Sequence, residues 1–83
     1  MKNEMLLYAL ESHRTVAVQF RTKAGTVRNM ACTRRLEDVP DELRDGINTP
    51  KLNGPDIVCV YDHLIKEWRA FRWDSVIAFE PIN

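Results

Sequence analysis

Aromatic and arginine side chains alternate from Trp68 to Trp73, and a short apolar run follows from Val76 to Phe79. Alternation with a period of two is the pattern of a half-buried β-strand, and a short apolar run fits a second, more buried strand. The residues Trp73-Asp74-Ser75 lie between the two and supply a corner. The C-terminal stretch 67–80 therefore predicts a strand, a tight corner and another strand.

Two hairpins are predicted: one lies before this stretch, and the other includes its first strand. The residues 15–22 alternate, and one face carries the apolar side chains Val16, Val18 and Phe20. Gly25 supplies the positive φ that a tight turn needs before a second strand over 27–33. The β-rich run 56–61 is expected to pair with 67–72 across the short link 62–66.

Helical segments are predicted at two places. Residues 2–12 contain good helix formers, and Met5, Leu6 and Leu10 fall on one side at helical spacing, which predicts a short amphipathic helix within residues 1–13. The run Val39-Pro40-Asp41-Glu42-Leu43 predicts a proline-initiated helical turn. Residues 44–55, with two glycines and two prolines, predict a loop that is either a binding loop or only a connection.

Length and composition fit one domain over 1–83. A chain of 83 residues, 45% of them hydrophobic, supplies one modest core. It has no run of about 18 apolar residues, and the apolar segment 5–10 is too short for a membrane span and is followed by Glu11 rather than a cleavage site. Cys32 and Cys59 sit inside strand-like runs, which favours buried, reduced thiols. We therefore expect a soluble, unexported protein of the cytoplasm that makes no contact with membranes.

Charge is balanced in sum but not in distribution. The chain has 12 basic and 12 acidic residues, so its net charge does not indicate a polyanionic partner. Residues 12–36 carry six basic side chains and no acidic one, whereas 37–45 carry five acidic side chains and only Arg44 as a cation. The distribution predicts one positive and one negative surface, unless both are ordinary solvated faces.

Taken together, these elements predict a mainly β fold, a small five-stranded SH3-like or Sm-like barrel over 15–80 with a short N-terminal α-helix. Within that order, the segments 16–26, 58–62 and Trp68-Arg69-Ala70-Phe71-Arg72-Trp73-Asp74-Ser75-Val76 resemble the small WYL-related, Sm-like SH3-barrel proteins of tailed phages and bacteria. The Trp-Tyr-Leu triplet of the larger WYL family is absent, so we transfer no ligand-sensing site. The resemblance implies a non-enzymatic, phage-encoded or bacterial barrel in a lineage where nucleic-acid or nucleotide recognition is suspected.

The residues themselves give no signature of catalysis, a metal or a cofactor. His13, Cys32, Cys59 and His63 would be a possible four-ligand zinc set, yet no two of them have the close spacing that zinc sites usually show. No nucleophile motif is present, and three isolated glycines cannot form a phosphate loop. We therefore expect a protein that is not an enzyme and holds no cofactor.

The candidate binding residues are basic and aromatic side chains on the two hairpins. Arginine forks suit phosphates, and an exposed tryptophan can stack on an unpaired base. The predicted nucleic-acid-binding residues are Arg21, Lys23, Arg28, Arg34, Arg35, Trp68, Arg69 and Arg72. Strand alternation leaves two arrangements open for 67–72: either Phe71 faces the core and Trp68 lies outside with Arg72, or Trp68 faces the core. A third reading is that the aromatic side chains simply fill the core.

Two other roles compete with nucleic-acid binding. The acidic segment 37–45 would repel DNA but could engage a basic surface, which favours a module that inhibits or redirects a host protein. Self-assembly into a homo-oligomer through strand edges is the third. Steep salt dependence distinguishes phosphate binding from an apolar protein interface.

Overall fold

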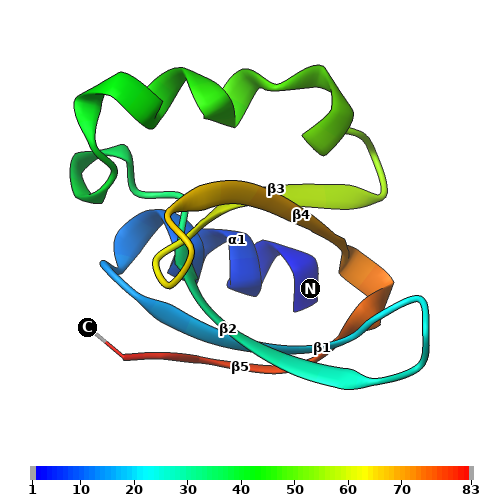
Figure 1. Cartoon of the computed structure of the whole chain (residues 1–83). Coiled ribbons are helices and arrows are strands. Elements are labelled where there is room, and N and C mark those ends of the chain that lie inside the picture. Colours follow the sequence, from blue (N-terminus) through cyan, green and yellow to red (C-terminus); the bar gives the residue numbers. More distant parts are fainter. Residues whose placement is uncertain (1, 83) are drawn as a thin grey trace.

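The computed structural model describes residues 2–82, although the side chain of Lys2 is outside the description. One helix, α1 (Lys2–Ser12), is followed by five strands, which are β1 (Val16–Arg21), β2 (Val27–Thr33), β3 (Ile57–Asp62), β4 (Glu67–Arg72) and β5 (Val76–Pro81). The strands form one antiparallel sheet in the order β4-β3-β2-β1-β5. The predicted fold class is confirmed: a mainly β, small five-stranded barrel-like domain with a short N-terminal helix (Figure 1).

β2 is the strand at which the sheet changes direction. It pairs with β1 from Val27 to Cys32, but it pairs with β3 only through its last two residues, Cys32 opposite Asp62 and Thr33 opposite Tyr61. The sheet is therefore divided into β5-β1-β2 and β2-β3-β4, which curve towards each other in Figure 1. The one-turn 3₁₀ helix η4 (Trp73–Ser75) joins the two edge strands, as the predicted corner requires.

The core lies between α1 and the inner face of the sheet. Leu6, Ala9 and Leu10 of α1 pack on apolar side chains of β1 to β4, and Trp73, Val76 and Phe79 pack on the same cluster. The alternation predicted for β1 is confirmed, because every second side chain from Val16 to Phe20 is buried. Thr33 fixes the C-terminal end of α1, since its hydroxyl donates to the carbonyl oxygens of Leu10 and His13.

The prediction of a loop over 44–55 is wrong for residues 44–52. All of these residues except Thr49 belong to two 3₁₀ helices, η2 (Asp41–Asn48) and η3 (Pro50–Leu52), which pack on the outer face of β3 and β4. The side-chain amide of Asn53 donates to the carbonyl oxygens of Ile47 and Thr49, at 2.9 and 2.7 Å. These hydrogen bonds satisfy backbone carbonyls at the end of η2 and help to hold the segment as 3₁₀ helix despite its prolines and glycines. The helical turn predicted around Asp41 is confirmed.

Both cysteines are buried free thiols, as predicted. Burial raises the pKa of Cys32 to about 12, and Asp62 adds to the shift. Cys59 lies beneath η2, where its thiol is 3.8 Å from the carbonyl oxygen of Gly46. Among residues 2–82, no helix has the length and apolar character needed to cross a membrane.

Candidate nucleic-acid interface

A cavity of about 380 Å³ opens between the end of β1 and the edge strand β4. Two phenylalanines, Phe20 and Phe71, contribute to its apolar lining. The basic residues that line it are Arg21, Lys23, Arg69 and Arg72, and within residues 2–82 no aspartate or glutamate does so. The fold therefore brings four of the eight sequence-predicted residues to one place.

Strand alternation explains why apolar and basic side chains meet here. Phe20 and Phe71 point into the core, where their rings are stacked with centroids 5.3 Å apart and planes 20° apart. Arg21 follows Phe20 and is exposed at the end of β1. Its guanidinium donates to the carbonyl oxygen of Gly25 at 3.0 Å, and Gly25 has the predicted positive φ of 88°. The hairpin turn thus holds one of the four cations in place.

Arg72 has an acidic partner next to the cavity. Its Nε and one terminal nitrogen donate to the two carboxylate oxygens of Asp74, at 3.1 and 3.3 Å. This hydrogen bond holds the pKa of Asp74 below its usual value, and it raises the pKa of Arg72. Both side chains remain largely exposed, so a phosphate would have to compete with Asp74 for the same guanidinium.

Arg28 lies beside the cavity without lining it. In the β1–β2 ladder it is directly opposite Phe20, so both side chains project from the same face of the hairpin. The side chain of Arg28 is exposed. It therefore extends the basic surface from the cavity along β2.

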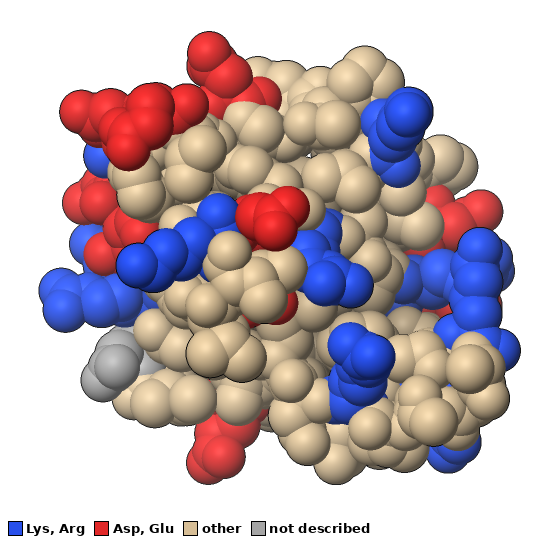
Figure 2. Space-filling view, viewed as in Figure 1, with Lys and Arg blue, Asp and Glu red and all other residues tan. Residues whose placement is uncertain are grey.

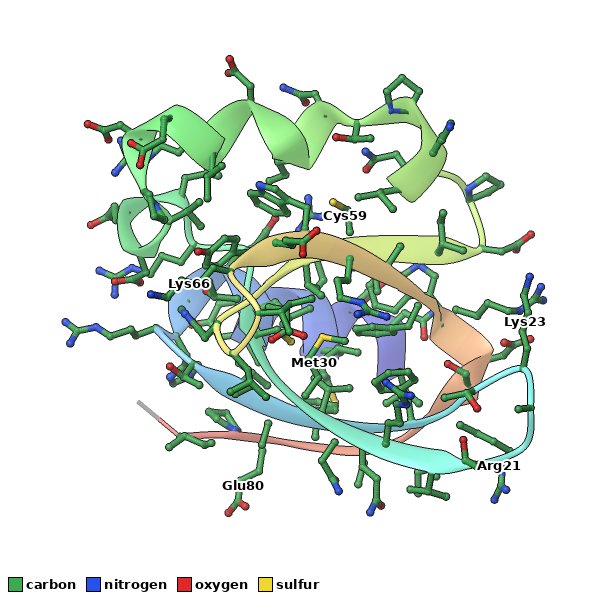
Figure 3. All side chains as sticks on the ribbon, viewed as in Figure 1. Arg21, Lys23, Met30, Cys59, Lys66 and Glu80 are labelled. Carbon is green, nitrogen blue, oxygen red and sulfur yellow. The ribbon has the colours of Figure 1, made fainter. Side chains whose placement is uncertain are left out.

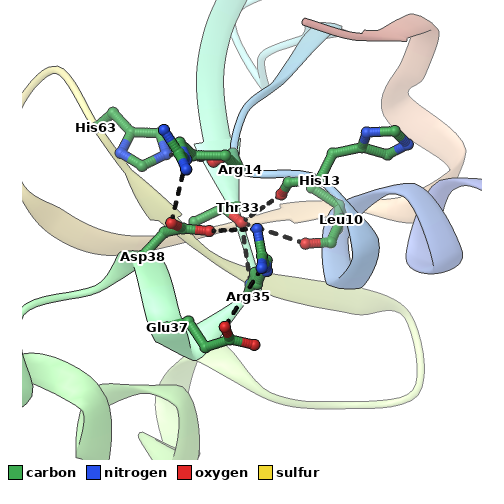
Figure 4. Close-up of polar contacts among 8 residues, drawn as sticks. All are labelled: Leu10, His13, Arg14, Thr33, Arg35, Glu37, Asp38 and His63. Carbon is green, nitrogen blue, oxygen red and sulfur yellow. Dashed lines mark hydrogen bonds and ion pairs between the residues drawn. The ribbon is translucent and has the colours of Figure 1, made fainter. Parts of the chain in front are cut away.

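Arg34 and Arg35 are not part of this surface. Arg34 donates to the carbonyl oxygen of Cys59 at 2.6 Å, and its Nε lies 3.7 Å from Glu11, with only 18% of the side chain exposed. Arg35 makes ion pairs with Glu37 and Asp38. Figure 4 shows Arg35 converging with Arg14 on the Asp38 carboxylate. These arginines connect α1, β3 and the 36–38 turn, so we assign them to the stability of the fold.

Trp68 is covered rather than presented to a base. Phe71 faces the core, which leaves Trp68 on the outer face of β4. There the indole N–H donates to the carbonyl oxygen of Leu43 at 2.6 Å. A Cβ added to Gly46 would overlap the indole ring, so η2 lies directly on it. The first of the two predicted arrangements of β4 is present, but η2 takes the place that the sequence analysis gave to a nucleic-acid base.

The acidic segment occupies another part of the surface. Glu37, Asp41, Glu42 and Asp45 are exposed on the 36–48 segment. Figure 2 shows acidic side chains gathered at the upper left, where this segment begins in Figure 1. Figure 3 shows Arg21 and Lys23 at the right-hand end of the molecule and Lys66 towards the left. Arg21 and Lys23 therefore lie away from the acidic segment.

The sequence analysis missed several residues that line the cavity, namely Thr22, Ile57, Ala70 and Ser75. None of them belongs to a motif, and only the tertiary fold brings them together. Within residues 2–82, no three His, Cys, Asp or Glu side chains gather as a metal site requires.

Comparisons with protein-family models, curated proteins and solved structures find no significant match to this chain. The resemblance to the WYL-related barrels therefore stays a prediction based on the segments quoted for it.

Proposed function

We propose that this protein is a non-enzymatic barrel that binds nucleic acid at the cavity beside the β1–β2 turn, which we call the hairpin end of the domain. The observation that carries the proposal is the cavity between β1 and β4. Four basic side chains line it, and among residues 2–82 no acidic side chain does so. Guanidinium groups bind phosphates through paired hydrogen bonds, and phosphate contacts supply most of the affinity of such complexes. Phage or bacterial origin and a cytoplasmic location belong to the same proposal, and the latter is supported by two free thiols.

A net charge of zero is compatible with this role because the acidic segment 37–45 lies away from Arg21 and Lys23 at the cavity. The exposed acidic side chains of 37–45 gather away from the hairpin end. At physiological ionic strength, exposed charges farther apart than about 8 Å are largely screened from one another. A phosphate at the cavity therefore interacts mainly with the charges near it, which are the four cations of the lining and Asp74 beside Arg72.

Fluorescence anisotropy with labelled single-stranded DNA, double-stranded DNA and RNA tests the proposal. We expect saturable binding at low salt that weakens steeply towards physiological salt. Arg69→Glu is expected to abolish it. Lys66→Glu is the matched control, because it makes the same charge reversal at an exposed residue outside the cavity lining. Absence of binding at low salt, or equal loss in both variants, would contradict the proposal.

The second candidate is a protein-binding module that acts through the acidic segment. Its supporting observation is exposure, since 77% of the Glu37 side chain and 83% of the Asp41 side chain are accessible. A basic, nucleic-acid-binding surface on a host protein is the partner that such a patch fits. The double variant Glu42→Lys, Asp45→Lys would abolish binding to that partner and leave oligonucleotide binding unimpaired, whereas Arg69→Glu would do the reverse.

A further inference from the structure

The cavity has the dimensions of a site for one small ligand. Its volume of about 380 Å³ lies at the lower end of the range of about 300 to 1,000 Å³ that is usual for small-molecule sites. A base that remains paired and stacked within a duplex cannot enter such a cavity, so a duplex offers only its backbone to the basic rim. An unpaired nucleotide can place its base inside.

Resting on the function proposed above, we propose that this cavity is a subsite for one unpaired nucleotide, with its base on the apolar floor and its phosphate against the basic rim. Phe20 and Phe71 line the floor with the small part of their surface that the core leaves accessible, 9% for Phe20 and 5% for Phe71. Contacts of bases with aromatic side chains tolerate any sequence, because every base has an apolar face.

The free edge of β4 supplies hydrogen-bonding groups for the base. The N–H of Trp73 donates to the carbonyl oxygen of Asp56, which fixes the alternation of the β3–β4 ladder. By that alternation Phe71 and Arg69 bond to β3, while the N–H and C=O of Ala70 point away from β3. Because β4 is a terminal strand and Ala70 lines the cavity, one backbone donor and one acceptor are available there.

A contact nearby shows that this edge accepts polar partners. The hydroxyl of Ser75 donates to the carbonyl oxygen of Arg72 at 2.7 Å. Arg72 is two residues beyond Ala70, so its carbonyl also points away from β3. A side chain thus satisfies the free carbonyl of Arg72 on this strand edge. At Ala70 we assign the same role to the polar groups of a base.

The four cations of the basic rim are not equivalent, because one of them, Arg72, is paired with a carboxylate. Asp74 holds the guanidinium of Arg72. The phosphate of the bound nucleotide is therefore assigned to Arg21, Lys23 and Arg69. Arg21 is already oriented by Gly25, and the single hydrogen bond that it makes there leaves further N–H donors for a phosphate.

Three labelled DNA ligands of equal length test the subsite without changing the core. They are a single strand, the same strand with abasic sites at its central positions, and the duplex of that strand. We expect the abasic strand to bind about fivefold more weakly than the intact strand, the lower end of the range for the loss of one stacked base, because little of either phenylalanine is accessible. We expect the duplex to bind more weakly than the intact strand as well. Equal binding of all three would overturn the subsite and leave the proposed function standing, whereas binding of none would overturn both.

A free nucleotide has the same chemistry as a nucleotide within a strand, and NMR titration distinguishes the two sources. Deoxyadenosine monophosphate and the single strand are each expected to shift the Ala70 amide and the Phe20 ring protons, whereas inorganic phosphate is not. Saturation at far lower concentrations of the strand would assign the subsite to nucleic acid, and equal saturation would assign it to free nucleotides. If neither ligand shifts the Ala70 amide, the proposal is wrong.

Discussion

The indole ring of Trp68 lies directly against Gly46, so that the outer face of β4 and the middle of η2 are in contact at a residue with no side chain. The same indole donates its N–H to the carbonyl oxygen of Leu43 at 2.6 Å. Together these contacts hold the 41–52 segment on the sheet.

Gly46→Ala is expected to destabilise the protein, because the added methyl group would overlap the indole. Overpacking of this kind lowers the free energy of unfolding by about 1–3 kcal/mol. Urea denaturation followed by circular dichroism measures the change. Gly54→Ala is the control, since its Cβ would lie 3.6 Å from the nearest atom of Ile57, an ordinary contact. Equal stability of the two variants would show that η2 does not pack on Trp68 as described.

Trp68→Phe separates stability from binding. The variant keeps a ring against η2 but leaves the carbonyl oxygen of Leu43 without its donor, which lowers the free energy of unfolding by about 1 kcal/mol. Oligonucleotide affinity is expected to stay unchanged, because η2 covers this ring. Denaturation and anisotropy on the same preparation test both statements. A large loss of affinity in a folded Trp68→Phe variant would restore Trp68 as a base-stacking residue.

Asp74→Asn is expected to increase affinity for nucleic acid, because it releases the Arg72 guanidinium for a phosphate. One additional phosphate contact steepens the dependence of log K on log salt by about one. Anisotropy titrations at several salt concentrations measure the slope. Asp41→Asn is the matched control, since Asp41 is an exposed carboxylate paired with Arg44 at 2.6 Å on η2. If both variants gain affinity equally, net charge alone accounts for the effect.

The raised pKa of the buried Cys32 thiol is expected to lower the stability of the protein at alkaline pH. Burial raises the pKa of this thiol from 9.0 to about 12, so above pH 9 the unfolded chain releases a proton that the folded protein keeps. The part of the free energy of unfolding that depends on this proton is fully present below pH 9. It falls by about 1.4 kcal/mol per pH unit as the pH rises towards 12. Urea denaturation between pH 8 and about pH 11 should therefore show a flatter decline for Cys32→Ala than for the parent. Parallel declines would mean that Cys32 is not shielded from solvent.

Alternation within single strands was sufficient to predict much of the fold. The period of two in 15–22 placed Phe20 in the core, and Gly25 marked the turn. Alternation was not sufficient for β4, because the core covers one face of this strand and η2 covers the other. Phe71, in the core, and Trp68, under η2, are therefore both shielded from solvent. A periodic sequence pattern does not distinguish a side chain that packs in the core from one that a 3₁₀ helix covers.

The candidate site was only half predictable for a related reason. Arg34 and Arg69 are both arginines that follow or lie within a predicted strand, and nothing local tells them apart. Arg34 points to the carbonyl oxygen of Cys59, 25 residues away in the chain, whereas Arg69 lines an open cavity. The difference arises from contacts between distant segments, which composition and spacing do not record.

The most direct test of nucleic-acid binding at the hairpin end is an amide NMR titration of the isotopically labelled protein with a short single-stranded oligonucleotide at low salt. We expect the largest shifts in residues 20–23 and 69–75, and only small shifts in 34–45. Shifts concentrated in 34–45, or no shifts at saturating oligonucleotide, would contradict this assignment and leave the acidic segment as the better candidate for a binding surface.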